Sequence, residues 1–104
     1  MKTKLVMIMM FVLLLAAGAV QAGGDAANGQ ALSVDCADCH GADGKGDDEN
    51  PALAGLAEAE FIAALQGYAS GERVDESEMM GDYATGLSEQ DMADLAAYYA
   101  SLGQ

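Results

Sequence analysis

The chain has 104 residues, with 17 Asp and Glu against 4 Lys and Arg, one His, two Cys and a formal net charge of −13. This length fits one domain and excludes an enzyme with separate cofactor and substrate lobes. The acidic charge argues against a nucleic-acid binder, since phosphate contacts need a cationic surface.

The N-terminal segment has the pattern of a secretory signal peptide. Two lysines precede an apolar run over residues 5–20, and small residues then form an A-x-A-like cleavage site ending at Ala22. The run contains a glycine and is shorter than the roughly 20 residues of a membrane-spanning helix, which disfavours an uncleaved anchor. We therefore expect residues 1–22 to be removed and residues 23–104 to form the exported domain, with no membrane span after cleavage.

The expected mature domain is small and strongly acidic. Lys45 and Arg73 are its only cations against all 17 acidic residues, which gives a formal charge of −15. Such a short chain builds a thin core and usually needs a disulfide, a metal or a cofactor. Cys36 and Cys39 are the only cysteines, and a bridge between them would close too small a loop to stabilise a whole fold. Another group must therefore hold the domain together.

The expected elements are helices and loops, with no convincing strand. An Ala-rich helix runs from Asp25 to about Cys39, and a loop rich in glycine and acidic residues follows over residues 41–50. A second helix is expected over residues 57–69. Its apolar face is formed by Phe61, Ile62, Leu65 and Tyr68.

Residues 71–86 are expected to be irregular, and they contain Met79 and Met80. The last helix has the clearest pattern, because Ser88 can cap it and Asp91 three residues later forms a near capping box. Its apolar stripe consists of Met92, Leu95, Tyr98, Tyr99 and Leu102.

The segment Cys36-Ala37-Asp38-Cys39-His40 carries the clearest chemical motif. C-x-x-C-H is the attachment signature of c-type haem. Two thiols at this spacing can each add to one haem vinyl group, and the following His40 can bind the iron as its fifth ligand. Covalent attachment fixes a large apolar cofactor in a chain too small to bury it by packing alone. The motif therefore predicts one covalent haem c, bound through Cys36 and Cys39.

Three other interpretations of the motif are less favoured. A structural zinc site needs four ligands, and the chain has no second cysteine pair and no other histidine. A thioredoxin-like redox pair is found in a βαβ context, and no strand is expected before the motif. A structural disulfide would close only the small loop discussed above.

The sixth position of the iron decides the function. A second strong ligand favours electron transfer, whereas an open position allows gas binding or peroxidase chemistry. Without a second histidine, the candidates are a methionine, Lys45 or no ligand. Met92 lies on the apolar stripe, where packing is expected, whereas Met79 and Met80 lie in a stretch free to reach the distal face. Ligation by methionine sulfur would raise the reduction potential.

These segments resemble the class I c-type cytochromes, in particular the small bacterial group that includes cytochromes c-553 and c-5 and the halves of the dihaem c-4 type. The resemblance covers nearly all of residues 23–104. It rests on CADCHGADGKG at the haem-attachment segment, PALAG from residue 51, and MMGDYATGLSEQDMADLAAYYASL from residue 79. It implies an all-α class I cytochrome c fold, with three to four short helices wrapped around one covalent haem.

The resemblance also implies which residues contact the iron. In this group the axial methionine lies seven residues before the leucine of a Leu-Ser-acidic segment, and counting back from Leu87 gives Met80, with Met79 as the fallback. The axial ligands are then His40 and Met80. The backbone carbonyl of Pro51 is expected to accept a hydrogen bond from the second ring nitrogen of His40.

By the same resemblance, the first and last helices cross where Gly29 faces Tyr98, since glycine permits a close backbone approach. Tyr99 is expected at the surface edge. The acidic residues after the motif lack the calcium-loop pattern, so a solvated loop is favoured over a calcium site. They are Asp43, Asp47, Asp48 and Glu49. The high net charge fits either a salt-rich habitat or docking to a basic partner.

We therefore expect a periplasmic monohaem cytochrome that carries single electrons between redox proteins and is not an enzyme by itself. The sequence does not identify the donor or the acceptor. Two alternatives stay open. One is the haem c subunit of an enzyme complex such as a flavoprotein sulfide dehydrogenase, and the other is a ligand-binding haem protein.

Overall fold

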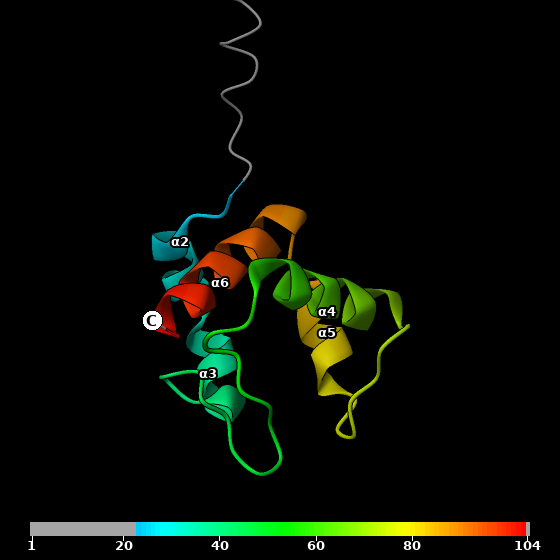
Figure 1. Cartoon of the computed structure of the whole chain (residues 1–104). Coiled ribbons are helices and arrows are strands. Elements are labelled where there is room, and N and C mark those ends of the chain that lie inside the picture. The colour runs from blue at the N-terminus through cyan, green and yellow to red at the C-terminus, as the bar shows by residue number, and fades with distance from the viewer. Residues whose placement is uncertain (1–22, 104) are drawn as a thin grey trace, which may run out of the picture.

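The computed structural model describes residues 23–103, so the expected signal peptide lies outside the described residues. The described part is all-helical, as expected, and contains no strand. Its helices are α2 (Ala26–Leu32), α3 (Val34–His40), α4 (Glu58–Ser70), α5 (Met79–Thr85) and α6 (Glu89–Leu102) (Figure 1). Within residues 23–103, no helix combines the length and apolar character needed to cross a membrane.

The first expected helix is in fact two helices, α2 and α3, joined at Ser33. The Ser33 hydroxyl donates a 2.7 Å hydrogen bond to the Gln30 carbonyl. The backbone ψ angle of Ser33, −8°, departs from the helical value. Serine bonds of this kind compete with the backbone pattern and bend a helix, so the prediction of one helix from Asp25 to Cys39 was wrong. The start was correctly placed, because the Asp25 carboxylate caps α2 by accepting the amides of Ala27 and Asn28.

Helix α2 packs across α6, so the first and last helices of the described part lie side by side (Figure 1). Gly29 is buried at this crossing. A Cβ there would overlap the Asp94 backbone carbonyl and lie 2.8 Å from the Tyr98 Cβ. The structure therefore places Gly29 against Tyr98, as expected.

The core lies where α4 packs against α5 and against α6. It consists of Phe61, Leu65, Ala84, Met92, Leu95, Ala96 and Tyr99. Tyr99 is only 1% exposed, so the expectation that it lies at the surface edge was wrong. The reason is that α6 is covered on this side: the Tyr99 ring stacks on Phe61 at 5.6 Å, and a Cβ at Gly44 would lie 2.8 Å from it.

Residues 71–86 are more ordered than expected, because they contain helix α5. This segment has no apolar periodicity of its own, and α5 gains its order by packing on α4. The other two helices follow the sequence pattern closely. Helix α4 lies one residue later than expected at each end, and α6 begins with the full capping box between Ser88 and Asp91.

Candidate haem site

Helix α3 presents the motif residues in order along its last two turns. Cys36 is half-buried, Cys39 is exposed, and both thiols are free. They lie three positions apart, so they are neighbours on the helix surface. His40 is the last residue of α3 and is 5% exposed. Gly41, with φ of 87°, then ends the helix in a conformation that favours glycine.

The His40 ring is fixed by the backbone of Pro51. Its Nδ1 lies 2.7 Å from the Pro51 carbonyl oxygen. A carbonyl can only accept, so Nδ1 carries the proton and Nε2 keeps a free lone pair. This contact leaves the imidazole with one nitrogen that can bind a metal.

Glycines hold the loop that brings Pro51 to His40. The Gly46 amide donates a 2.8 Å hydrogen bond to the His40 carbonyl. Gly46 has φ of 69°, and a Cβ there would overlap the Asn50 carbonyl and lie 2.7 Å from the Pro51 carbonyl oxygen. The Gly44 carbonyl accepts the amides of Leu53 and Ala54. Only glycine at position 46 therefore leaves room for the carbonyl that orients His40.

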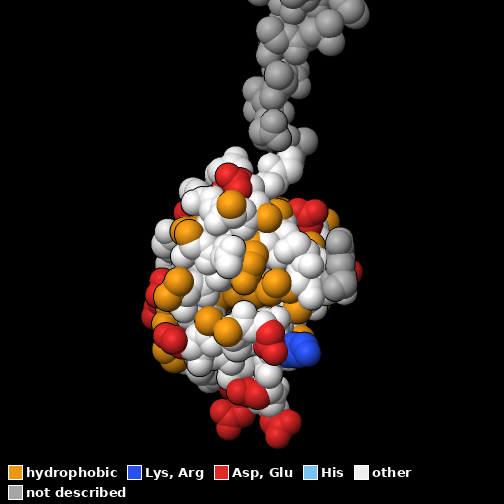
Figure 2. All heavy atoms as spheres, turned by 90° about the vertical axis from the view of Figure 1, so that its left-hand side faces the viewer, with side chains coloured by type: hydrophobic (Ala, Val, Ile, Leu, Met, Phe, Trp, Pro, Cys, Tyr) orange, Lys and Arg blue, Asp and Glu red, His pale blue; other side chains and the backbone are white. Residues whose placement is uncertain are grey.

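Two acidic residues of this loop, Asp43 and Asp47, accept hydrogen bonds from the loop's own backbone. The Asp47 carboxylate accepts the amides of Glu49 and Asn50, and these hydrogen bonds hold the pKa of Asp47 below its usual range. Among residues 23–103, no three His, Cys, Asp or Glu side chains come together as a metal site. Figure 2 shows acidic side chains at the lower end of the molecule, where Figure 1 places this loop, with apolar side chains gathered above them.

The two thiols differ in environment. Burial raises the pKa of the Cys36 thiol, the charge of Asp35 adds to this, and a side-chain hydrogen bond with Tyr99 acts in the opposite direction. Before haem is attached, Cys36 therefore stays protonated at neutral pH. The interaction with Tyr99 also links the motif to the core, because the Tyr99 ring stacks on Phe61.

The three methionines of the described part have different surroundings. Met92 is 3% exposed within the core, as expected for a packing residue. Met79 is 50% exposed, whereas Met80 is half-buried against the core. The Met80 amide donates a 3.3 Å hydrogen bond to the Asp75 carboxylate. Asp75 was not predicted from the sequence, and the Asp-x-Ser pattern before α5 is the one signal that could have indicated it.

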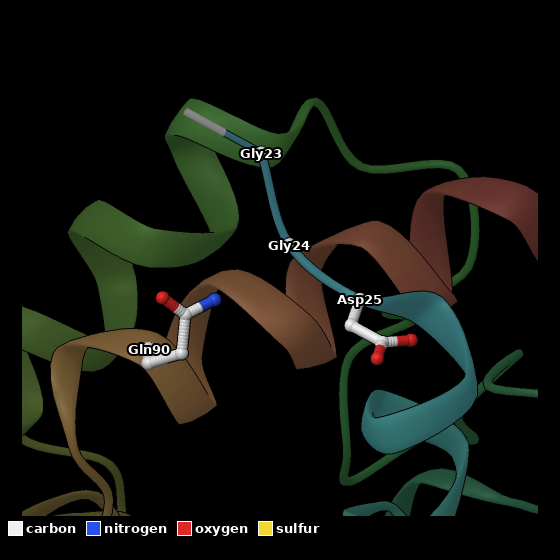
Figure 3. A pocket seen from close by; sticks show the side chains of 4 residues that line it. All are labelled: Gly23, Gly24, Asp25 and Gln90. Carbon is white, nitrogen blue, oxygen red and sulfur yellow. The ribbon is translucent and has the colours of Figure 1, made fainter. Parts of the chain in front are cut away.

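A surface pocket of about 320 Å³ lies at another part of the molecule (Figure 3). It is lined by Gly23, Gly24, Asp25 and Gln90. These residues provide no thiol, imidazole or thioether, so the pocket offers no ligand of the kind that haem iron binds in proteins.

The donor set at α3 fits haem c. Two free thiols lie at neighbouring positions on one helix, and the next residue is a buried imidazole whose Nδ1 is already bonded. The family model for cytochrome c matches residues 26–103. The chain belongs to the cytochrome c family. Its cofactor is covalently attached haem c.

Individual relatives support the same family. The chain is 46% identical to cytochrome c4 of Pseudomonas aeruginosa over 81% of its own length and 41% of that protein. It is 39% identical to cytochrome c-554(547) of Halothiobacillus neapolitanus, over 76% of this chain and 98% of the relative. Cytochrome c4 of Acidithiobacillus ferrooxidans has a similar structure, with a TM-score of 0.71 and 29% identity over 80% of this chain and 52% of that one. This cytochrome chain thus spans about half the length of the c4 proteins it matches.

Proposed function

We propose that this protein is a monohaem electron carrier whose haem c is attached through Cys36 and Cys39, with His40 and Met80 as axial ligands of the iron. The observation that carries the proposal is the 2.7 Å contact between His40 Nδ1 and the Pro51 carbonyl. It fixes the tautomer and the ring plane, so Nε2 is the nitrogen available to iron. Carbonyl and carboxylate partners of this kind also raise the basicity of a histidine ligand.

The exposure of the methionines supports Met80 over Met79. Neighbouring residues on a helix project about 100° apart, so these two side chains cannot face the same direction. Met79 is half-exposed at 50%, whereas Met80 packs against the core. An inward-facing thioether is the one able to reach the iron.

Two strong axial ligands suit electron transfer. The haem supplies the redox chemistry, and a methionine ligand shifts its potential upward. The chain's own residues hold the ligands in place, so a change of oxidation state requires little rearrangement. We place this carrier in the periplasm, in agreement with the signal pattern of residues 1–22, and do not assign it an enzymatic activity of its own.

The surface charge favours basic redox partners. Residues 23–103 contain all 17 acidic residues, and Lys45 and Arg73 are the only cations among them. Rates of electron transfer with a basic partner should then fall steeply as salt rises toward about 0.15 M, where the Debye length is about 8 Å. Rates that stay flat or rise would point instead to an apolar docking face.

The function is tested with the purified holoprotein. A carrier should titrate as a one-electron couple, purify without a flavoprotein, and leave ferrous iron unreactive toward carbon monoxide. Stable co-purification with a flavoprotein would replace the carrier by a haem subunit of an enzyme complex. Rapid carbon monoxide binding by the wild-type protein would identify an open sixth position and a ligand-binding haem protein.

A further inference from the structure

We propose that Asp75 is a positioning residue for Met80, because its carboxylate sets the register of the first turn of α5. The inference rests on the proposed function, in which Met80 binds the iron. Asp75 itself contacts no cofactor in this proposal. It acts by deciding which of two adjacent methionines faces the core.

Asp75 accepts hydrogen bonds from groups just before α5 and in its first turn. The Met80 amide donates to Asp75 Oδ1 at 3.3 Å, and the Glu78 amide donates to the Asp75 carbonyl at 3.1 Å. The Ser77 hydroxyl donates to Asp75 Oδ2, and the Met79 amide donates to the Ser77 hydroxyl oxygen at 3.3 Å. The amides of both methionines are therefore bound, one directly and one through Ser77, to the same carboxylate.

Among the described residues, Asp75 and the Ser77 hydroxyl bonded to it are the side chains that accept the first amides of α5. The first amides of a helix lack partners within the helix and depend on a cap. Glu78 occupies the cap position of α5 but makes no side-chain capping bond, and its φ of 60° is in the left-handed region. It is the only non-glycine residue with positive φ among residues 23–103. A seven-residue helix that begins at a strained residue thus depends on Asp75 for its register.

The segment before Asp75 is anchored at the end of α4. The Arg73 amide donates a 3.0 Å hydrogen bond to the Gly67 carbonyl, and the Arg73 guanidinium lies 5.1 Å from the centre of the Tyr68 ring. Asp75 is therefore held at a fixed place beside α4.

A loss of register would exchange the two methionines. Met79 is half-exposed and Met80 packs against the core, and a rotation of α5 by one residue would reverse this. The Asp75 carboxylate opposes that rotation, because its acceptor oxygen pairs with the amide of residue 80 and not with that of residue 79.

The test compares three holoprotein variants: Asp75→Ala, Asp75→Asn and Glu76→Ala. Asp75→Asn keeps an acceptor oxygen for the Met80 amide. Glu76→Ala removes the same charge from an exposed neighbour. The readouts are the weak sulfur-to-iron absorption band of the ferric protein and the rate of carbon monoxide binding to the ferrous protein. Far-ultraviolet circular dichroism checks that each variant is folded.

Asp75→Ala should weaken the band and speed carbon monoxide binding by about fivefold, which corresponds to the roughly 1 kcal/mol net contribution of a typical hydrogen bond. Asp75→Asn should retain most of the wild-type behaviour, and Glu76→Ala should match wild type. The inference is overturned if Asp75→Ala behaves as wild type, or if Glu76→Ala shows the same change. Met80→Ala separates the two proposals. If Met80→Ala leaves the band intact, the assignment of Met80 as the ligand fails. If Met80→Ala abolishes the band while Asp75→Ala has no effect, only the positioning role of Asp75 fails.

Discussion

The backbone amide of Asp25 donates a 2.7 Å hydrogen bond to the carboxylate of Asp94, which is 3% exposed on α6. The same carboxylate accepts the Asn28 amide group at 2.6 Å and the Gln90 amide group at 2.9 Å. Three donors satisfy this buried charge, and two of them belong to the start of α2. Asp94 therefore joins the beginning of the described chain to its last helix.

Replacing Asp94 should destabilise the protein through this junction. Asp94→Ala leaves the Asp25 amide and the side chains of Asn28 and Gln90 without their acceptor, and unpaired donors at a helix interface are costly. We expect a clear fall in the thermal unfolding midpoint of the holoprotein. Glu60→Ala, the same loss of charge at an exposed position of α4, is the control and should have little effect. Equal midpoints for both variants would contradict the role of Asp94.

The contribution of Asp94 should depend on pH. Hydrogen bonds from the Asp25 amide, Asn28 and Gln90 lower the pKa of Asp94 in the folded protein. Its stabilisation is therefore fully present above the unfolded pKa of about 3.9 and is lost as pH falls through the lower folded value. Unfolding midpoints of wild type and Asp94→Asn, measured from pH 7 to pH 3, should begin to draw closer below about pH 4. A constant difference would exclude this linkage.

Tyr99 should ionise at a higher pH than an ordinary tyrosine. Burial is the main cause that raises the pKa of Tyr99. Stability linked to this hydroxyl is present below the ordinary pKa of about 10 and is lost as pH rises toward the folded value. In an ultraviolet titration, one of the four tyrosines should ionise only when the protein unfolds. Tyr99→Phe should remove that late component and no other.

Gly29→Ala should weaken the crossing of α2 and α6. The new Cβ would overlap the Asp94 backbone carbonyl, which cannot move without displacing α6. Overpacking of this kind costs about 1–3 kcal/mol. Chemical denaturation of the holoprotein measures the cost. Gly86→Ala is the matched control, because a Cβ there meets its nearest atom, the Tyr83 carbonyl oxygen, only at 3.5 Å. A similar loss in both variants would show that the crossing has no special requirement for glycine.

The methionine assignment gives the most direct prediction about the haem. Met80→Ala should abolish the sulfur-to-iron band, lower the reduction potential and open the ferrous iron to carbon monoxide. Met79→Ala should leave all three nearly unchanged, because its side chain points to solvent. Met92→Ala should keep the band while reducing stability by about 2–5 kcal/mol through a core cavity. If the band survives each of the first two changes but not the double variant, the two methionines exchange at the iron.

The features best predicted from the sequence are those that depend on residues close together in the chain. The motif at Cys36 and the capping box at Ser88 are both complete within a few positions, so each could be identified locally. Helix α5 was missed because its order comes from Asp75 and from packing on α4, and neither is visible as an apolar period. Tyr99 was expected at the surface because both Tyr98 and Tyr99 fit the apolar stripe of the last helix. The loop at Gly44 covers Tyr99, and the helix pattern does not reveal this contact.

Asp94 was also missed, although a signal existed. It lies four residues before Tyr98 and so shares that residue's helix face. Gly29 was already expected to pack on this face. A carboxylate buried between two helices needs hydrogen-bond donors from the neighbouring helix. This requirement would have predicted a buried acceptor at position 94.

The crossing of α2 and α6 also constrains when the fold can form. Among the described helices, α2 packs on only α3 and α6. Asp25 and Asp94, which meet at this crossing, are separated by 69 positions in the chain. Because α2 has seven residues, it is too short to be stable in water alone. The segment that carries the cysteines therefore lacks its permanent support until α6 is in place.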